Sequence, residues 1–136
     1  MDIHRAGSRD SRKGNPDYFT GSVTLDPIAD APAPARAKAA RVSFEPGTRT
    51  AWHTHPLGQT LHVLTGVGRV QTEGEPVRAI RAGDSIWIPP GEKHWHGAGP
   101  TTSMVHLALQ EELNGVQADW LEKVSDEDYL AEPQDI

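Results

Sequence analysis

Short runs in which apolar and polar side chains alternate recur along most of this sequence. In residues 37–44, Val42 and Phe44 fall on one face of an extended chain, whereas Arg41 and Ser43 fall on the other. A period of two is typical of a strand with one buried face. The same alternation between turn residues predicts further strands at 18–25, 49–55, 59–65, 69–72, 77–80, 85–88, 94–97 and 102–110.

Residues that interrupt strands separate these runs. Prolines punctuate residues 26–35, and because a proline has no N–H to donate to a sheet, this stretch is predicted to be a loop. Gly66 and Gly68 predict a turn between two strands. Ser125, followed by acidic residues, predicts a single helical turn at 125–130. Many short strands with regular turns indicate an all-β sandwich or barrel.

The length of 136 residues favours a single domain over residues 1–136. Within it, we expect an N-terminal arm and strand at 1–25, a barrel core at 37–111 and a C-terminal cap or tail at 114–136. The 13 Gly and 11 Pro agree with many turns and little helix.

Charge and hydropathy exclude several classes of partner. The net charge of −6 argues against the basic surface that nucleic acid or an anionic membrane would need. No apolar stretch approaches the length that spans a bilayer. The polar N-terminus, MDIHRAGSRDSRKG, lacks the apolar segment of a signal peptide, so a cytoplasmic protein is expected.

Histidine spacing points to a metal site. Because the chain has no cysteine, any metal must be held by nitrogen and oxygen donors. On a strand, His53 and His55 project to the same side, and the Pro–Gly interruption that follows can turn the Gln59 carboxamide back toward them. Further along, His94 and His96 repeat the two-residue spacing. We therefore expect the two segments to bind one metal ion inside a small β-barrel.

These residues resemble the two sequence motifs of the cupin family. The first motif, G-x5-H-x-H-x3,4-E-x6-G, is matched by Gly47, His53, His55, Gln59 and Gly66, with Gln in place of Glu. The second, G-x5-P-x-G-x2-H-x3-N, is matched by Gly83, Pro89, Gly91, His94 and Ala98, with Ala in place of Asn. The resemblance implies a jelly-roll β-barrel.

The chain is also similar along nearly its whole length to a narrower group, the small bacterial manganese cupins with hydroxynitrile lyase activity. The similarity includes the segments IHRAGS, DYFTGSV, TAWHTHPLGQTL and GEKHWHGA. It implies the ligands His53, His55, His94 and Gln59 and a pocket that includes Ala40, Val42, His96, His106 and Gln110. Manganese is implied by the resemblance alone, because three imidazoles and one amide oxygen suit Mn²⁺, Fe²⁺, Zn²⁺ and Ni²⁺ about equally.

The function predicted on this basis is the reversible cleavage of an aromatic cyanohydrin, such as mandelonitrile, to an aldehyde and hydrogen cyanide. The metal would act as a Lewis acid on the hydroxyl group. His106 would be the general base, although a lone inward histidine can also be an ordinary core residue. His96 and Gln110 would hold the nitrile or the oxygen. The residues expected to shape the pocket around the ring are Ala40, Val42 and Leu61.

Two other functions remain open, because cupins host many chemistries. One is an O₂-dependent dioxygenase with Fe²⁺ on the same ligands, and the other is a non-catalytic cupin that binds a small molecule or a metal. Exposed sheet edges and the arm at 1–25 favour a homodimer or a homotetramer.

Overall fold

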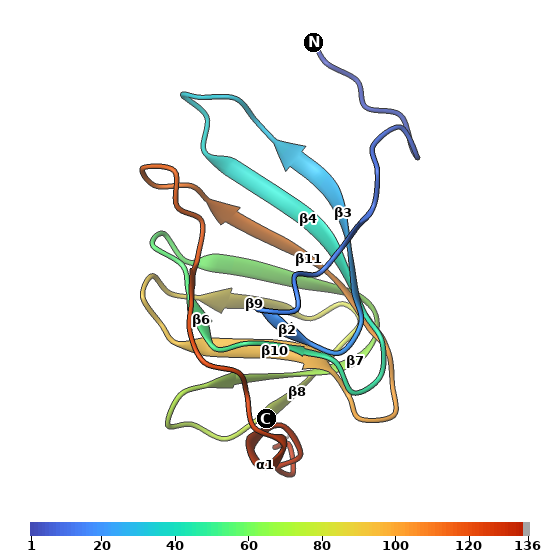
Figure 1. Ribbon diagram of the computed structural model, residues 1–136, viewed down its shortest axis with the longest axis vertical. Helices are drawn as coiled ribbons and strands as arrows, with labels where there is room; N and C mark the ends of the chain where they lie inside the picture. Colours follow the sequence, from blue (N-terminus) through green and yellow to red (C-terminus); the bar gives the residue numbers. More distant parts are fainter. Residues whose placement is uncertain (135–136) are drawn as a thin grey trace.

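The computed structural model describes residues 1–134 of the chain, and nearly all of its regular structure is β-strand (Figure 1). The elements, in chain order, are β1 Arg12–Lys13, β2 Phe19–Thr20, β3 Val23–Asp30, β4 Ala37–Phe44, β5 Arg49–Thr50, β6 His53–Thr54, β7 Gln59–Thr72, β8 Arg78–Arg81, β9 Ser85–Ile88, β10 His94–Ala98, β11 Met104–Glu111, β12 Asp119–Trp120 and α1 Asp126–Tyr129. The all-β expectation is therefore confirmed.

The strands form one curled sheet that encloses the core like a half-barrel (Figure 1). Hydrogen bonds link the strands in the order β1-β3-β4-β11-β7-β10-β5-β2, with β8 and β9 paired to β7, and β6 paired to β10 and β12. Side chains on the concave face pack together because alternate residues of every strand point inward. The buried members of this core are Phe19, Val23, Val42, Phe44, Leu61, Val63, Ile80, Ile88, Ala98, Met104 and Ala108.

The turn predicted at Gly66 and Gly68 is wrong, because β7 runs through both glycines without a break. Its first half pairs with β11, where Met104 lies opposite Gly66. Its second half pairs with β10, where Ala98 lies opposite Gly68. The two glycines therefore mark the corner at which one strand passes from one side of the half-barrel to the other. Gly66 has a φ of 82°, which explains a glycine here.

The loop predicted at 26–35 is also partly wrong, since β3 continues to Asp30. Pro27 lies within the strand opposite Ala40, and the register shifts immediately after it, between Pro27 and Ala29. A proline without an N–H is tolerated at such an irregularity. The strand predicted at 49–55 is in fact the two short strands β5 and β6.

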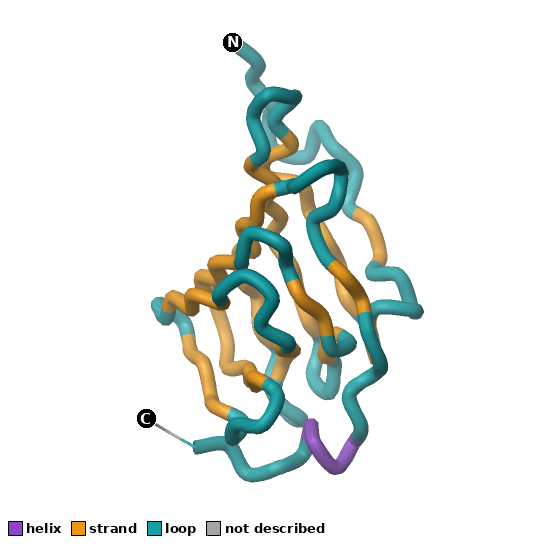
Figure 2. The backbone as a smooth tube through the Cα atoms, turned by 90° about the vertical axis from the view of Figure 1, so that its left-hand side faces the viewer, coloured by secondary structure: helices purple, strands orange, loops and turns teal. Residues whose placement is uncertain are grey.

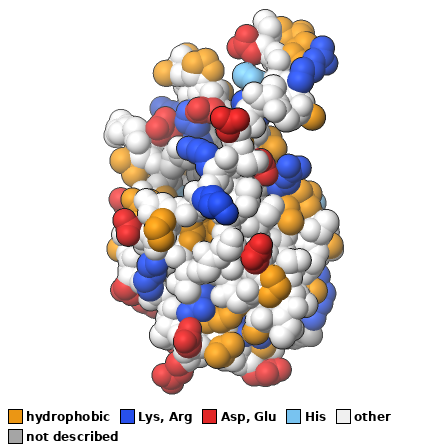
Figure 3. All heavy atoms as spheres, turned by 45° about the vertical axis from the view of Figure 1, so that its right-hand side comes forward, with side chains coloured by type: hydrophobic (Ala, Val, Ile, Leu, Met, Phe, Trp, Pro, Cys, Tyr) orange, Lys and Arg blue, Asp and Glu red, His pale blue; other side chains and the backbone are white. Residues whose placement is uncertain are grey.

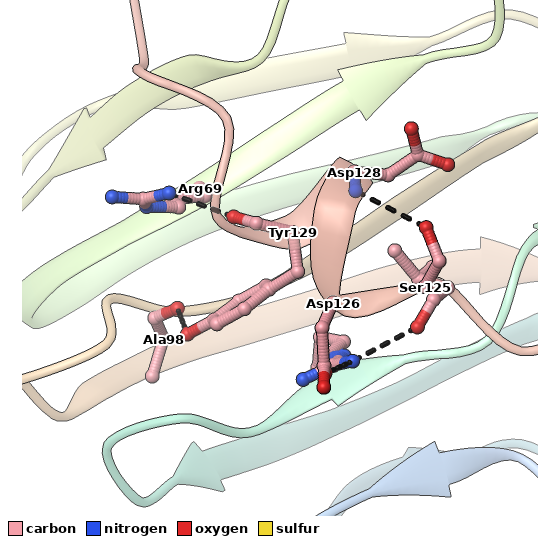
Figure 4. Close-up of polar contacts among 8 residues, drawn as sticks. Arg69, Ala98, Ser125, Asp126, Asp128 and Tyr129 are labelled. Atoms are coloured by element: carbon pink, nitrogen blue, oxygen red, sulfur yellow. Dashed lines mark hydrogen bonds and ion pairs between the residues drawn. The ribbon is translucent and has the colours of Figure 1, made fainter.

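The predicted helical turn is confirmed and lies at the end of the molecule away from the N-terminus (Figure 2). Ser125 caps it by accepting a hydrogen bond from the Asp128 N–H. The Tyr129 hydroxyl donates to the Ala98 carbonyl of β10 (Figure 4). Arg49 lies over the Tyr129 ring, 4.5 Å from its centroid. The C-terminal segment is thus fastened to β10, the strand that carries His94 and His96.

Gly66→Ala tests the corner in β7. An alanine Cβ at this position would overlap the Ser103 carbonyl group, and the left-handed φ adds its own strain. We expect the free energy of unfolding to fall by roughly 3 kcal/mol. Chemical denaturation followed by tryptophan fluorescence measures the change.

Gly74→Ala is the matched control, because Gly74 has nearly the same φ, 84°, and open space around its Cβ position. It should cost about 1 kcal/mol, the strain alone. Equal losses in the two variants would show that the β7 corner imposes no steric demand.

Candidate active site

A cavity of about 570 Å³ opens on the concave side of the sheet. One part of its wall is apolar, from Tyr18, Phe19, Leu25, Ala40, Val42, Ala108 and Trp120. Another part is polar, from Thr50, His53, His55, Gln59, His96, Gln110 and Gln117. The cavity therefore offers an apolar space beside a set of nitrogen and oxygen donors, which is typical of a small-molecule site.

Strand pairing brings the two predicted histidine segments together. β6 and β10 run antiparallel, and His53 lies directly opposite His94. Ring nitrogens of His53, His94 and His96 lie within 4.8 Å of one another, and all three side chains are buried. The ring centroids of His53 and His55 are 5.0 Å apart, and those of His55 and His94 are 5.5 Å apart. The two histidine segments therefore meet, and His96 is one of the three histidines whose ring nitrogens form this group.

Backbone carbonyls fix which nitrogen each ring offers. The Nδ1 atoms of His53, His55 and His94 lie 2.9, 2.7 and 2.8 Å from the carbonyl oxygens of Ala51, Gln117 and Glu92, respectively. A carbonyl oxygen accepts, so each Nδ1 carries the proton and each Nε2 has a free lone pair. The Nε2 atoms of His53 and His55 are buried and have no hydrogen-bond partner. Metal-binding histidines are oriented in this way.

Gln59 adds an oxygen to these nitrogens. Its Oε1 lies 3.3 Å from His94 Nε2. Because His94 carries its proton on Nδ1, the two atoms present lone pairs to each other, and a cation between them would remove the repulsion. The Gln59 amide group donates to Gln110, and the Gln110 amide group donates to Gln117. These two hydrogen bonds hold the Gln59 side-chain oxygen toward the histidines.

Burial keeps the rings neutral. It lowers the pKa of His53 and His96 well below the usual value, assisted by the neighbouring histidines. Burial also lowers the pKa of His55, and it lowers the pKa of His94 to about 4. Neutral imidazole is the form that binds a metal ion. The residues present thus fit a divalent ion that accepts nitrogen and neutral oxygen donors, including Mn²⁺, Fe²⁺, Zn²⁺ and Ni²⁺.

His96 and His106 form a hydrogen-bonded pair, with His96 Nδ1 and His106 Nε2 3.0 Å apart. His96 lines the cavity, whereas His106 is fully buried behind it and does not. Burial lowers the pKa of His106 to about 4. Leu61, predicted to shape the pocket, is also fully buried and lies outside the cavity wall.

The C-terminal segment contributes site residues that strand periodicity does not reveal. Trp120 stacks on the His53 ring with centroids 4.5 Å apart and on Tyr18 at 4.6 Å. Gln117 orients His55 through its backbone carbonyl. Both residues lie in the segment 114–136, for which the sequence predicts only a cap or tail.

The family model for the cupin domain matches residues 40–109. The chain belongs to the cupin family. This cupin is 59% identical over 129 residues to the (R)-mandelonitrile lyase of Granulicella tundricola, which covers 95% of this chain and 98% of that one. The 129 matched residues extend well beyond the histidine motifs.

Solved structures agree with the fold of this cupin. A cupin-like protein from Thermotoga maritima superposes with a TM-score of 0.82 at 40% identity, over 95% of both chains. The polyketide cyclase RemF from Streptomyces resistomycificus superposes with a TM-score of 0.69 at 22% identity, over 95% of this chain and 89% of that one. At this lower identity, the likeness shows the fold alone.

The stability of the metal-free protein should depend on the buried histidines. Because the pKa of His106 is about 4 in the folded state and about 6.5 when unfolded, the unfolded chain takes up a proton first as the pH falls. The contribution of neutral His106 to the free energy of unfolding is complete above about pH 6.5 and is lost progressively toward pH 4. Urea unfolding of chelator-treated protein at several pH values measures this loss.

His106→Asn provides the comparison, because it removes one of the buried imidazoles that make the protein less stable at low pH. Its unfolding free energy should fall less steeply between pH 6.5 and pH 4 than that of the wild type, whatever its absolute stability. Parallel curves would contradict the assignment of the loss to His106.

Proposed function

We propose that this cupin is a metal-dependent hydroxynitrile lyase. It would cleave an aromatic cyanohydrin such as mandelonitrile to an aldehyde and hydrogen cyanide, and catalyse the reverse addition. The observation that carries the proposal is the 59% identity, over 95% of the chain, to a protein named (R)-mandelonitrile lyase. The cavity supports it, because an apolar space lies beside neutral nitrogen and oxygen donors.

The proposed ligands are His53, His55, His94 and Gln59. In the three histidines, the ring Nδ1 is hydrogen-bonded to a backbone carbonyl oxygen. The Gln59 side-chain oxygen points toward His94. The proposed ion is Mn²⁺, on the basis of the resemblance to manganese cupins. When bound, a divalent ion supplies a Lewis acid that makes a neighbouring hydroxyl group more acidic.

His106 remains the proposed general base, but its position requires that it act through His96. The buried His96 Nε2 has no partner, and the ring lines the cavity. His96 would accept the cyanohydrin proton at Nε2 and pass its Nδ1 proton to Nε2 of His106, 3.0 Å away. The same two transfers in reverse would return a proton to the departing cyanide, so the protons balance.

The remaining predicted residues would shape the cavity and orient Gln59 and the substrate. Ala40 and Val42 line the cavity, and their small side chains leave room for a ring. Leu61 would act only by supporting that wall from behind. Gln110 faces the cavity and is bonded to two other glutamine side chains, so we assign it the orientation of Gln59 as well as contact with the substrate.

Assembly and location complete the proposal. Trp87 and Leu109 lie opposite Thr60 on the two strands that flank β7, and they are 60% and 46% exposed. This exposed apolar surface supports a homodimer or a homotetramer. Over the described residues, no helix has the length and apolar character to span a membrane. We propose a cytoplasmic location and a small-molecule substrate.

The ligand set is tested by metal content. His55→Ala and His94→Ala should each lose most of the bound metal and at least 100-fold in mandelonitrile cleavage, because each removes a ring nitrogen from the site. His96→Ala should retain the metal. Elemental analysis of purified variants distinguishes the proposed set from the triangle of His53, His94 and His96, in which His55 would be dispensable.

The base is tested in metal-loaded variants. His106→Ala and His96→Ala should each lower kcat for mandelonitrile about 100-fold or more, with the metal retained, because either change breaks the proton path. Full activity in metal-loaded His106→Ala would contradict the role of His106. Oxygen consumption with a catechol, without mandelonitrile cleavage by the wild type, would contradict the lyase and favour a dioxygenase.

A further inference from the structure

Arg12 is the one charged residue among the described residues that line the cavity. It lies on β1 opposite Leu25, which belongs to the apolar wall. Its side chain is exposed, so it stands where the cavity meets solvent. The N-terminal arm projects from one end of the molecule (Figures 1 and 3) and precedes β1 in the chain.

The guanidinium group of Arg12 makes no hydrogen bond or ion pair with a described residue. Arg12 does contribute, through its charge alone, to the lowered pKa of the Asp30 carboxyl. However, Asp30 is already paired with Lys38. Asp26 is likewise occupied by Ser11 and Arg41. The neighbouring acids therefore leave the fork of donors on Arg12 available to a ligand.

The cavity reinforces this charge. Its described lining includes no Asp or Glu, and its polar groups are Thr, Gln and neutral His side chains, although the whole chain carries a net charge of −6. Low-dielectric walls beside charges of one sign focus the field into a cleft. The cavity is thus a positive site on an acidic protein.

Tyr18 adds a neutral donor to the cavity wall. Its ring stacks on Trp120 with an angle of 9° between the planes, and both rings line the cavity. No described residue accepts a hydrogen bond from the Tyr18 hydroxyl. An aromatic ligand packed on these rings would present a ring substituent to a guanidinium group and a hydroxyl group that both lack partners.

We propose that Arg12 makes the cavity selective for aromatic substrates that carry a carboxylate on the ring. A carboxylate matches the planar fork of arginine and accepts two parallel hydrogen bonds from it. The reacting group would lie at the histidines and the carboxylate at the mouth. The selectivity in turnover rests on the proposed lyase function, whereas the selectivity in binding does not.

The turnover experiment compares mandelonitrile with 4-carboxymandelonitrile in the metal-loaded protein. R12Q should lower kcat/KM for the carboxylated substrate about tenfold, mainly through KM, because a hydrogen-bonded charge contributes to binding in the ground state and the transition state alike. Mandelonitrile should change less than about twofold. R12K should recover part of the loss, since it restores the charge without the fork.

K13Q is the matched control, because Lys13 is exposed, adjacent on β1, and not part of the cavity wall. It changes the net charge by the same amount and should leave both substrates unaffected. Equal losses in R12Q and K13Q would overturn the proposal in favour of a general surface charge. An R12Q protein with unchanged kinetics for the carboxylated substrate would also overturn it.

A binding measurement separates this proposal from the lyase function. Calorimetry on the holoenzyme, without cyanide, compares 4-carboxybenzaldehyde with its neutral methyl ester. The wild type should bind the acid about tenfold more tightly than R12Q does, and the ester equally. This result in a protein without lyase activity would sustain the selectivity and reject the lyase. Lyase activity, together with equal binding of the acid by the wild type and R12Q, would sustain the lyase function and reject the selectivity.

Discussion

The structure is organised around lone pairs that face each other without a proton between them. His94 Nε2 and Gln59 Oε1 are 3.3 Å apart, and the His94 proton is committed to a backbone carbonyl on the other side of the ring. Buried acceptors without a donor are costly, so the surrounding fold must hold them in place. A divalent cation is the simplest group that turns this repulsion into binding.

Two parts of the chain hold these acceptors in position. The first is the pairing of β6, β7 and β10, which sets His53 opposite His94 and places both on the concave face. The second is the C-terminal segment, which lays Trp120 on the His53 ring and the Gln117 carbonyl on His55. Tyr129 fastens the end of that segment to Ala98, on the same strand as His94 (Figure 4). The tail is thus part of the site as well as a cover for the barrel.

Local pattern was sufficient to predict the strands and the histidines that converge, because a period of two and a two-residue spacing are properties of a single segment. It failed at Gly66, because a glycine suits both a turn and a strand that bends from one side of the half-barrel to the other. Only the pairing of β7 with both β11 and β10 shows that the strand continues. Periodicity placed His106 on the inner face, but not its depth behind His96. Gln117 owes its role to tertiary packing, which the sequence does not display.

The exchange of Glu for Gln at position 59 has a consequence for the whole cavity. With three neutral imidazoles and an amide as donors, a divalent ion bound there would keep its full charge, and the described lining contains no carboxylate to offset it. Such a site stabilises negative charge as it develops on an oxygen, more than a site with a glutamate would. It also discourages protonation of His96 and His106, whose pKa values burial already lowers. In the proposed reaction, the low basicity of this pair would be matched to a substrate proton that the ion has made acidic.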